Sequence, residues 1–172
     1  NKFTTGVGES DQYVQTSNEV CLNSPSQRIK IEKSMGNIPN TPILNNSTIA
    51  NGAEFFYYLS IENIGDTIVD RIFIRDELPT EVELVEIENI TPGVSTPVVT
   101  GNIITALIEN MPTDAIELIR IRVRVKDSVS IGTNFCNKFT TGVGESDQYV
   151  QTSNEVCLNT NNGSGSGIKF EK

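Results

Sequence analysis

Apolar and polar residues alternate along most of this chain, which is the pattern of extended strands with two different faces. The clearest run, ELIRIRVRVK at 117–126, places apolar residues such as Ile119 on one face and cations such as Arg120 on the other. Similar runs occupy 28–33, 54–63, 67–76, 81–88, 102–108, 134–141 and 149–159. The pattern therefore predicts eight short strands.

Turn-forming residues separate these runs, and no helical period interrupts them. The turn positions include Gly52, Gly65, Pro79, Gly93, Gly101, Pro112 and Gly132. No stretch combines a 3.6-residue apolar period with capping residues, so we expect no helix longer than a turn. Residues 34–50, rich in Asn, Pro and Thr, are expected to form a long loop or irregular edge. This organisation is typical of an all-β, antiparallel immunoglobulin-like β-sandwich of seven or eight strands.

An internal repeat changes how the length of 172 residues is interpreted. Residues 1–23 recur without a change at 137–159, a period of 136 residues. The C-terminal IKFEK at 168–172 also resembles IKIEK at 29–33. From this repeat we expect one complete unit with parts of its neighbours on either side.

The repeat divides the chain into three parts. We expect 1–27 to be the end hairpin of a preceding repeat plus a spacer, and 28–159 to be one complete sandwich. Residues 160–172 then form a Gly/Ser linker followed by the first strand of a next repeat. Three origins stay open: a slice of a tandem array, a subunit whose ends pair with neighbouring subunits, and an engineered chain with a designed linker.

Composition and charge disfavour several classes of function. The chain has 22 Asp and Glu against 13 Lys and Arg, and its net charge of −9 opposes nucleic-acid binding. It has no His, the commonest general base and zinc ligand, and no phosphate-binding loop or nucleophile elbow. No apolar run is long enough to span a membrane. We therefore expect no enzyme, no cofactor, no metal site, no nucleic-acid partner and no membrane span.

Three cysteines are candidates for covalent bonds. Cys136 and Cys157 lie on the two final predicted strands, where antiparallel neighbours approach closely enough for a disulfide; two buried free thiols are the alternative. Cys21 is the repeat equivalent of Cys157, and its expected partner would precede Asn1. It is therefore either left unpaired or bonded to another unit. Such bonds require an oxidising, extracellular setting.

A row of cations could form a ligand surface on one sheet face. The row consists of Arg120, Arg122, Arg124 and Lys126. It could bind acidic glycans or phosphate groups. The favoured explanation is a solvated face whose charges pair across strands with acids such as Glu81, Glu83 and Glu86.

An acidic corner offers a second candidate ligand site. Asp70, Asp76 and Glu77 could bind Ca²⁺, which prefers six to eight oxygen ligands. No calcium-loop motif supports this, and Asp76 is instead expected to hydrogen-bond the turn that it opens.

Lysines on the first strand and asparagines near the end of the unit also permit an intramolecular isopeptide bond. The candidates are Lys33 or Lys30 with Asn154 or Asn134, beside a buried acid such as Glu62. This chemistry requires a desolvated, neutral amine and a neighbouring proton shuttle. Because the sequence does not show that geometry, the Lys33–Asn154 bond is a secondary hypothesis.

Several short motifs follow one another in an order known from a surface-repeat family. A lysine-bearing first strand precedes Tyr58, the turn Asn63-Ile64-Gly65-Asp66, the corner Asp76-Glu77-Leu78-Pro79 and the closing strand Ser153-Asn154-Glu155-Val156. In this order the unit resembles the bacterial and archaeal family called domain of unknown function eleven. It departs from the family pattern at Ala53-Glu54 and in its paired cysteines. The resemblance implies a non-enzymatic sandwich, found in tandem in cell-wall proteins, surface fibres and spore appendages, and supplies no catalytic residue.

The ends of the chain indicate how such units would join. The five residues Ile168, Lys169, Phe170, Glu171 and Lys172 are too few to fold alone, so we expect them to donate a strand to another sheet. Contacts of this kind, head to tail, build filaments. We therefore expect a structural repeat of an extracellular fibre at a cell or spore surface, with copies of itself and a surface-anchoring protein as partners. The alternative is a glycan- or protein-binding stalk module of an adhesin.

Overall fold

In the computed structural model of this chain, the described runs of alternating apolar and polar residues form strands. The structure describes residues 28–37, 41–89, 91–144 and 151–161, together with the backbone of β1 (Thr4–Gly6) and β2 (Tyr13–Thr16). This described part contains no helix, and hence none that could cross a membrane. The predicted all-β class is confirmed.

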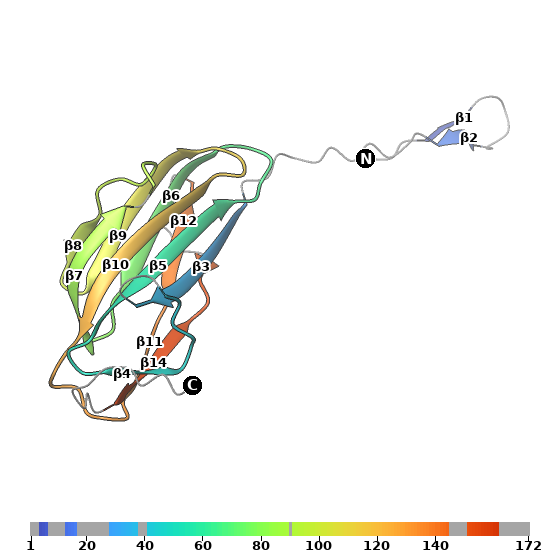
Figure 1. Cartoon of the computed structure of the whole chain (residues 1–172). Coiled ribbons are helices and arrows are strands. Elements are labelled where there is room, and N and C mark those ends of the chain that lie inside the picture. Colours follow the sequence, from blue (N-terminus) through green and yellow to red (C-terminus); the bar gives the residue numbers. More distant parts are fainter. Residues whose placement is uncertain are drawn as a thin grey trace.

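Two large sheets and one small sheet make up the unit. The first large sheet has the order β3 (Ile29–Gly36), β5 (Glu54–Asn63), β10 (Ile116–Val125) and β7 (Val82–Asn89). The second has the order β13 (Gln151–Thr152), β12 (Phe139–Val143), β6 (Val69–Glu77), β9 (Ile103–Met111) and β8 (Val98–Thr100). The small sheet is β11 (Asn134–Asn137), β14 (Val156–Asn161) and β4 (Ser47–Ala50). In Figure 1 the β3–β5–β10–β7 sheet lies in front of the second large sheet.

The core lies between the two large sheets because each strand turns one row of apolar side chains inward. In β10 the alternating residues Ile119, Ile121, Val123 and Val125 are all buried. They belong to one cluster with inward residues of the facing sheet, such as Ile72. Burying each such side chain contributes about 1.5–3 kcal/mol. The predicted immunoglobulin-like sandwich is therefore the observed architecture.

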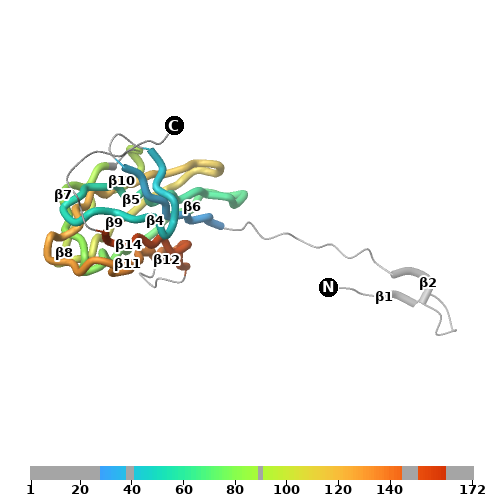
Figure 2. The backbone as a smooth tube through the Cα atoms, turned by 60° about the horizontal axis from the view of Figure 1, so that its bottom comes forward, coloured from blue at the N-terminus to red at the C-terminus, as the bar shows by residue number. Residues whose placement is uncertain are grey.

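The two final predicted strands are each divided in the structure. The run 134–141 becomes β11 and β12, which pair with β14 and with β6 respectively. The run 149–159 becomes β13 and β14. The alternation of buried residues continues across Lys138, so the chain changes partner strand without changing the face that it turns inward. Figures 1 and 2 show β4, β11 and β14 together at one end of the sandwich.

The prediction of a long loop at 34–50 was wrong in part. Strand β3 continues to Gly36, and β4 forms from Ser47 to Ala50. Strand β4 pairs in parallel with β14, whereas the other pairings are antiparallel. The partner that makes β4 a strand is thus more than one hundred residues away in the sequence.

The N-terminal copy of the repeat forms the same hairpin as the original. In β1 and β2, Thr4 pairs with Thr16 and Thr5 with Gln15. The corresponding pairs in β12 and β13 are Thr140 with Thr152 and Thr141 with Gln151. The register of this hairpin is therefore the same in both copies.

Candidate functional site

A lysine occupies an inward position in the first strand of the unit. The core-facing row of β3 is Ile29, Ile31, Lys33 and Met35, so Lys33 stands where the alternation calls for an apolar residue. Its side chain has no exposed surface. A buried ammonium is costly unless it is paired, so its surroundings indicate what the position does.

Asp76 is the partner of this lysine. It lies on the inward row of the second large sheet, after Ile72 and Ile74, and its side chain is also fully buried. Lys33 Nζ donates a hydrogen bond to Asp76 Oδ2 and forms an ion pair with it. The expectation that Asp76 hydrogen-bonds the turn was therefore wrong, because its bonded oxygen faces the core.

Aromatic rings enclose the buried amine. Lys33 Nζ lies 4.6 Å from the centre of the Tyr57 ring and 6.0 Å from that of Phe139. Desolvation lowers the pKa of Lys33 to about 8, although the charge of Asp76 and its hydrogen bond act in the opposite direction. Burial, and then the charge of Asp76, raise the pKa of Tyr57. The pocket therefore favours the neutral amine far more than water does.

A third polar residue, Asn137, lies on the inward row that passes Asp76. Phe135, Asn137, Phe139 and Thr141 are buried at alternate positions of β11 and β12, and Phe139 is directly opposite Asp76 in the register. Within the described part of the chain, Asn137 Nδ2, Asp76 Oδ1 and Thr141 Oγ1 have no hydrogen-bond partner. Each such buried atom costs about 1–3 kcal/mol. Sequence reasoning missed Asn137, although a polar residue at an inward position was visible in its alternation.

The other residues considered for an isopeptide bond are engaged elsewhere. Asn154 Oδ1 accepts from Lys33 N at 2.8 Å, and Asn154 Nδ2 donates to Lys33 O at 2.8 Å, so Asn154 holds the main chain of β3. Lys30 is exposed, and its Nζ lies 3.6 Å from Oε2 of Glu62, its partner residue on β5. Asn134 is exposed and donates to Asn159. Of the two lysines, the structure places only Lys33 in the core.

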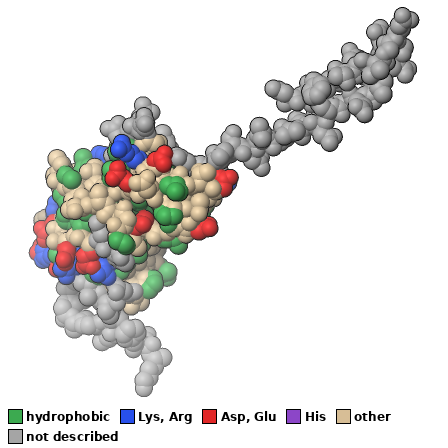
Figure 3. All heavy atoms as spheres, turned by 90° about the horizontal axis from the view of Figure 1, so that it is seen from above, with side chains coloured by type: hydrophobic (Ala, Val, Ile, Leu, Met, Phe, Trp, Pro, Cys, Tyr) green, Lys and Arg blue, Asp and Glu red, His purple; other side chains and the backbone are tan. Residues whose placement is uncertain are grey.

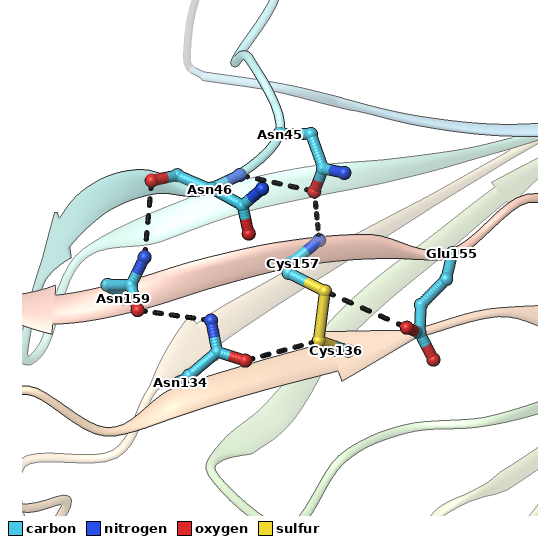
Figure 4. The surroundings of a disulfide bond; sticks show 7 residues. All are labelled: Asn45, Asn46, Asn134, Cys136, Glu155, Cys157 and Asn159. Atoms are coloured by element: carbon cyan, nitrogen blue, oxygen red, sulfur yellow. Dashed lines mark hydrogen bonds between the residues drawn. A yellow bond between two sulfur atoms is a disulfide. The ribbon is translucent and has the colours of Figure 1, made fainter.

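A disulfide joins Cys136 to Cys157 at the end of the sandwich where β11 pairs with β14. The two residues are direct partners in the register. Figure 4 shows asparagines around the bond: Asn45 Oδ1 accepts from Cys157 N, and Asn159 Nδ2 donates to Asn46 O at 3.2 Å. The disulfide fixes the strand on which Asn137 is the next residue.

The three arginines of the cationic row lie on β10 and pair with acids of β7, whereas Lys126 follows β10 and donates to the Thr80 carbonyl. Arg120 pairs with Glu88, Arg122 with Glu86 at 2.6 Å and Arg124 with Glu83 at 3.0 Å. These are the cross-strand pairs expected of a solvated face, with Glu88 in the place expected for Glu81. Figure 3 shows basic and acidic side chains beside one another on the face that it views. The row is thus a poor site for an anionic ligand.

The Asn63 side chain explains the Asn-x-Gly motif. Asn63 Oδ1 accepts from Gly65 N at 3.0 Å, and its Nδ2 donates to the carbonyls of Thr67, Met111 and Pro112. One fully buried side chain therefore joins the end of β5 to the end of β9.

Two predicted site features lie outside the described residues. These are Cys21, considered as an inter-unit disulfide partner, and the five strand-donating residues 168–172. Both stay predictions.

Comparison with solved structures finds the same fold in major pilin subunits and in a cohesin module. The major pilin subunit BcpA of Bacillus cereus superimposes with a TM-score of 0.63 and 15% identity over 88% of this chain and 46% of the pilin. The major pilin GBS80 of Streptococcus agalactiae gives 0.55 and 13% over 78% of this chain and 56% of that fragment. A cohesin module of a Clostridium perfringens glycoside hydrolase gives 0.51 and 18% over 81% of this chain and 99% of the module.

These likenesses show the fold alone. The chain spans about half the length of the pilin chains that it matches. No protein-family model matches the sequence, and no curated protein is significantly similar to it. The resemblance to domain of unknown function eleven therefore gains support only at the level of the β-sandwich fold.

Proposed function

We propose that this chain is a structural unit of an extracellular fibre or surface filament, joined head to tail to copies of itself by strand complementation. The observation that carries the proposal is the likeness of its fold to major pilin subunits over most of its length. The disulfide adds support, because such bonds persist in oxidising compartments outside the cytosol.

The internal repeat supports the way in which units would join. Residues 137–159 include β12, β13 and the first four residues of β14; β12 borders β6 and β14 borders β11 in the complete sandwich. The identical residues 1–23 can form the same hairpin but have no second set of body strands in this sequence. They therefore belong to another sandwich, which makes the chain a link between units.

The C-terminal residues 168–172 suggest the complementary half of the joint. They copy the start of β3, whose residues pair with β5 from Ile29 opposite Asn63 to Lys33 opposite Leu59. Because β3 fills this place in the described unit, we infer that residues 168–172 exchange with the β3 of a following unit. Such a strand gains its main-chain hydrogen bonds from the acceptor sheet and its specificity from alternate side chains.

Light scattering of the full chain at increasing concentration tests this joint. We expect assemblies larger than a monomer, and we expect Ile168→Asp/Phe170→Asp to remove them because both substitutions place charges on the apolar face of the donated strand. Lys169→Ala changes the opposite face and is the matched control, which should still assemble. A full chain that stays monomeric at every concentration contradicts the proposal.

Cys21 offers a covalent version of the same contact. We propose that it is oxidised in the assembled protein, since its repeat equivalent Cys157 is disulfide-bonded. Cysteine mapping of assembled protein under non-reducing conditions should then find Cys21 in an intermolecular disulfide. A free Cys21 thiol in assembled material contradicts this part of the proposal.

The alternative function is a stalk module of an adhesin that binds a glycan or a protein. The structures similar to this chain also include the C-terminal domain of a Streptococcus pyogenes antigen I/II-family protein, with a TM-score of 0.54 and 14% identity over 76% of this chain. A monomeric chain that binds an immobilised glycan would favour this alternative.

A further inference from the structure

We propose that Lys33 Nζ and Asn137 Cγ become joined by an intramolecular amide bond, formed with loss of ammonia and with Asp76 as the acid–base residue. This bond would lie inside one unit and does not depend on how units assemble. It can therefore be present in a monomer, and its failure would leave the proposed fibre function untouched.

The first support is the placement of three polar residues where the strand pattern calls for apolar ones. Lys33, Asp76 and Asn137 are 1%, 0% and 3% exposed, and they come from β3, β6 and β11. Each stands on the inward row of its strand. A hydrophobic residue would pack at lower cost at each of these three inward positions. Polar residues at all three, in one part of the core, therefore indicate a chemical role.

The second support is the spatial order of these residues. Lys33 Nζ already contacts Asp76, and it lies 6.0 Å from the ring centre of Phe139. Asn137 is two positions before Phe139 on the same inward row, and Phe139 is directly opposite Asp76. Asn137 therefore stands one inward position before the residue opposite Asp76, where the chain leaves β14 and joins β6.

The third support is the state of the side-chain atoms. Within the described residues, the amide nitrogen of Asn137 and the second carboxylate oxygen of Asp76 are buried without hydrogen-bond partners. Asn154, the alternative acceptor, uses both atoms of its amide to bind the main chain of Lys33. The free amide of Asn137 is therefore the better electrophile for the Lys33 amine.

The bond-forming step balances without any cofactor. Proton transfer from Lys33 to Asp76 gives a neutral amine, the form of Lys33 that its desolvation favours. Lys33 Nζ attacks Asn137 Cγ while Asp76 donates its proton to the Asn137 carbonyl oxygen. The new nitrogen–carbon bond forms and one amine proton passes through Asp76 to the departing amide nitrogen. As the old carbon–nitrogen bond breaks, the former carbonyl oxygen returns its proton to Asp76. Ammonia leaves, and Asp76 ends protonated with the proton that Lys33 first gave up, which then passes to solvent.

The surroundings fit this reaction. The Tyr57 ring, 4.6 Å from the amine, excludes water from the nucleophile. Asn137 also lines a surface pocket of about 370 Å³ beside Cys136 and Thr140, which gives ammonia a route to solvent. The disulfide at Cys136 holds the strand directly before the reacting asparagine. The product would join the first strand of the unit to a strand near its end.

Intact mass and peptide mapping of the reduced, alkylated full chain test the bond. We expect a mass lower by one ammonia and a branched peptide that contains Lys33 linked to Asn137. An unmodified mass with separate peptides for both residues would overturn the proposal. Peptide mapping is required because succinimide formation at Asn51-Gly52 also releases ammonia, and a loss mapped there counts against the proposal.

Variants assign the roles. Asn137→Ala should abolish the branched peptide, whereas Asn134→Ala, an exposed change on the same strand, should retain it. Asp76→Asn should slow its appearance by about 100-fold or more, since it keeps the shape but removes the acid–base group. A branched peptide that ends at Asn154, or one that forms equally fast in Asp76→Asn, would overturn the assignment.

Discussion

At the scale of single residues, the Lys33–Asp76 pair shows why buried charge is informative. Both side chains lack solvent contact, and their attraction must offset the desolvation of two ions. Replacing such a pair with apolar residues of similar volume is often neutral or stabilising, so stability alone gives little reason to keep it. A reactive role for the amine accounts for its presence better than a structural role does.

The burial of Lys33 predicts a pH dependence that the proposed amide removes. In Asn137→Ala the amine stays free, with a pKa of about 8 when folded against 10.5 when unfolded. Between these two values the unfolded chain binds more protons than the folded chain. The free energy of unfolding therefore increases as pH rises from 8, and this increase is lost again as pH falls back toward 8. From pH 8 to 9.5 the gain is about 1.5 kcal/mol.

Urea unfolding of that variant across this pH range measures the gain. The double variant Lys33→Met/Asn137→Ala is the control, because it retains every other titrating group, including Tyr57. Identical pH profiles for the two variants would show that Lys33 does not titrate in this way.

The three inward polar residues also show what the sequence reveals at this scale. Alternation alone gives Lys33, Asp76 and Asn137 inward positions once the strands are predicted. The sequence does not predict that these three residues lie close together, because that depends on which strands become neighbours. Asn154 drew attention as an asparagine on the last strand, but its side chain reaches the main chain of β3 instead.

At the scale of elements, long strands with a one-sided pattern were predictable and short strands were not. The run 54–63 matches β5 residue for residue, because ten alternating positions leave little freedom in assignment. Strand β8 has three residues, and β4 is defined by its parallel partner β14. These short strands form because they pair with strands elsewhere in the fold, and the local sequence gives no information about such contacts.

The disulfide predicts a measurable contribution from the β11–β14 pair. Cys136→Ser/Cys157→Ser should lower the free energy of unfolding by about 3 kcal/mol, because the bond restricts the unfolded chain around a loop of this size. Urea unfolding measures the change. Reducing agent should destabilise the unmodified protein by a similar amount and leave the variant unchanged; equal stability of all four samples would contradict the prediction.

At the scale of the whole molecule, the repeat is the basis of the proposal that the unit links sandwiches. One complete sandwich lies between residues that duplicate its last strands and residues that resemble its first. The disulfide and the proposed amide would crosslink the unit at two places. Two covalent crosslinks suit a domain that has to resist tension along a fibre. Its charged face is internally paired, which suits a surface exposed to solvent rather than to a polyanionic partner.

Electron microscopy of the concentrated full chain tests the central claim most directly. We expect uniform filaments with an axial repeat of about 4 nm, the size of one sandwich of this length, and no filaments with Ile168→Asp/Phe170→Asp. Isolated particles in every preparation, together with binding to an immobilised glycan, would contradict the fibre function and support the adhesin alternative.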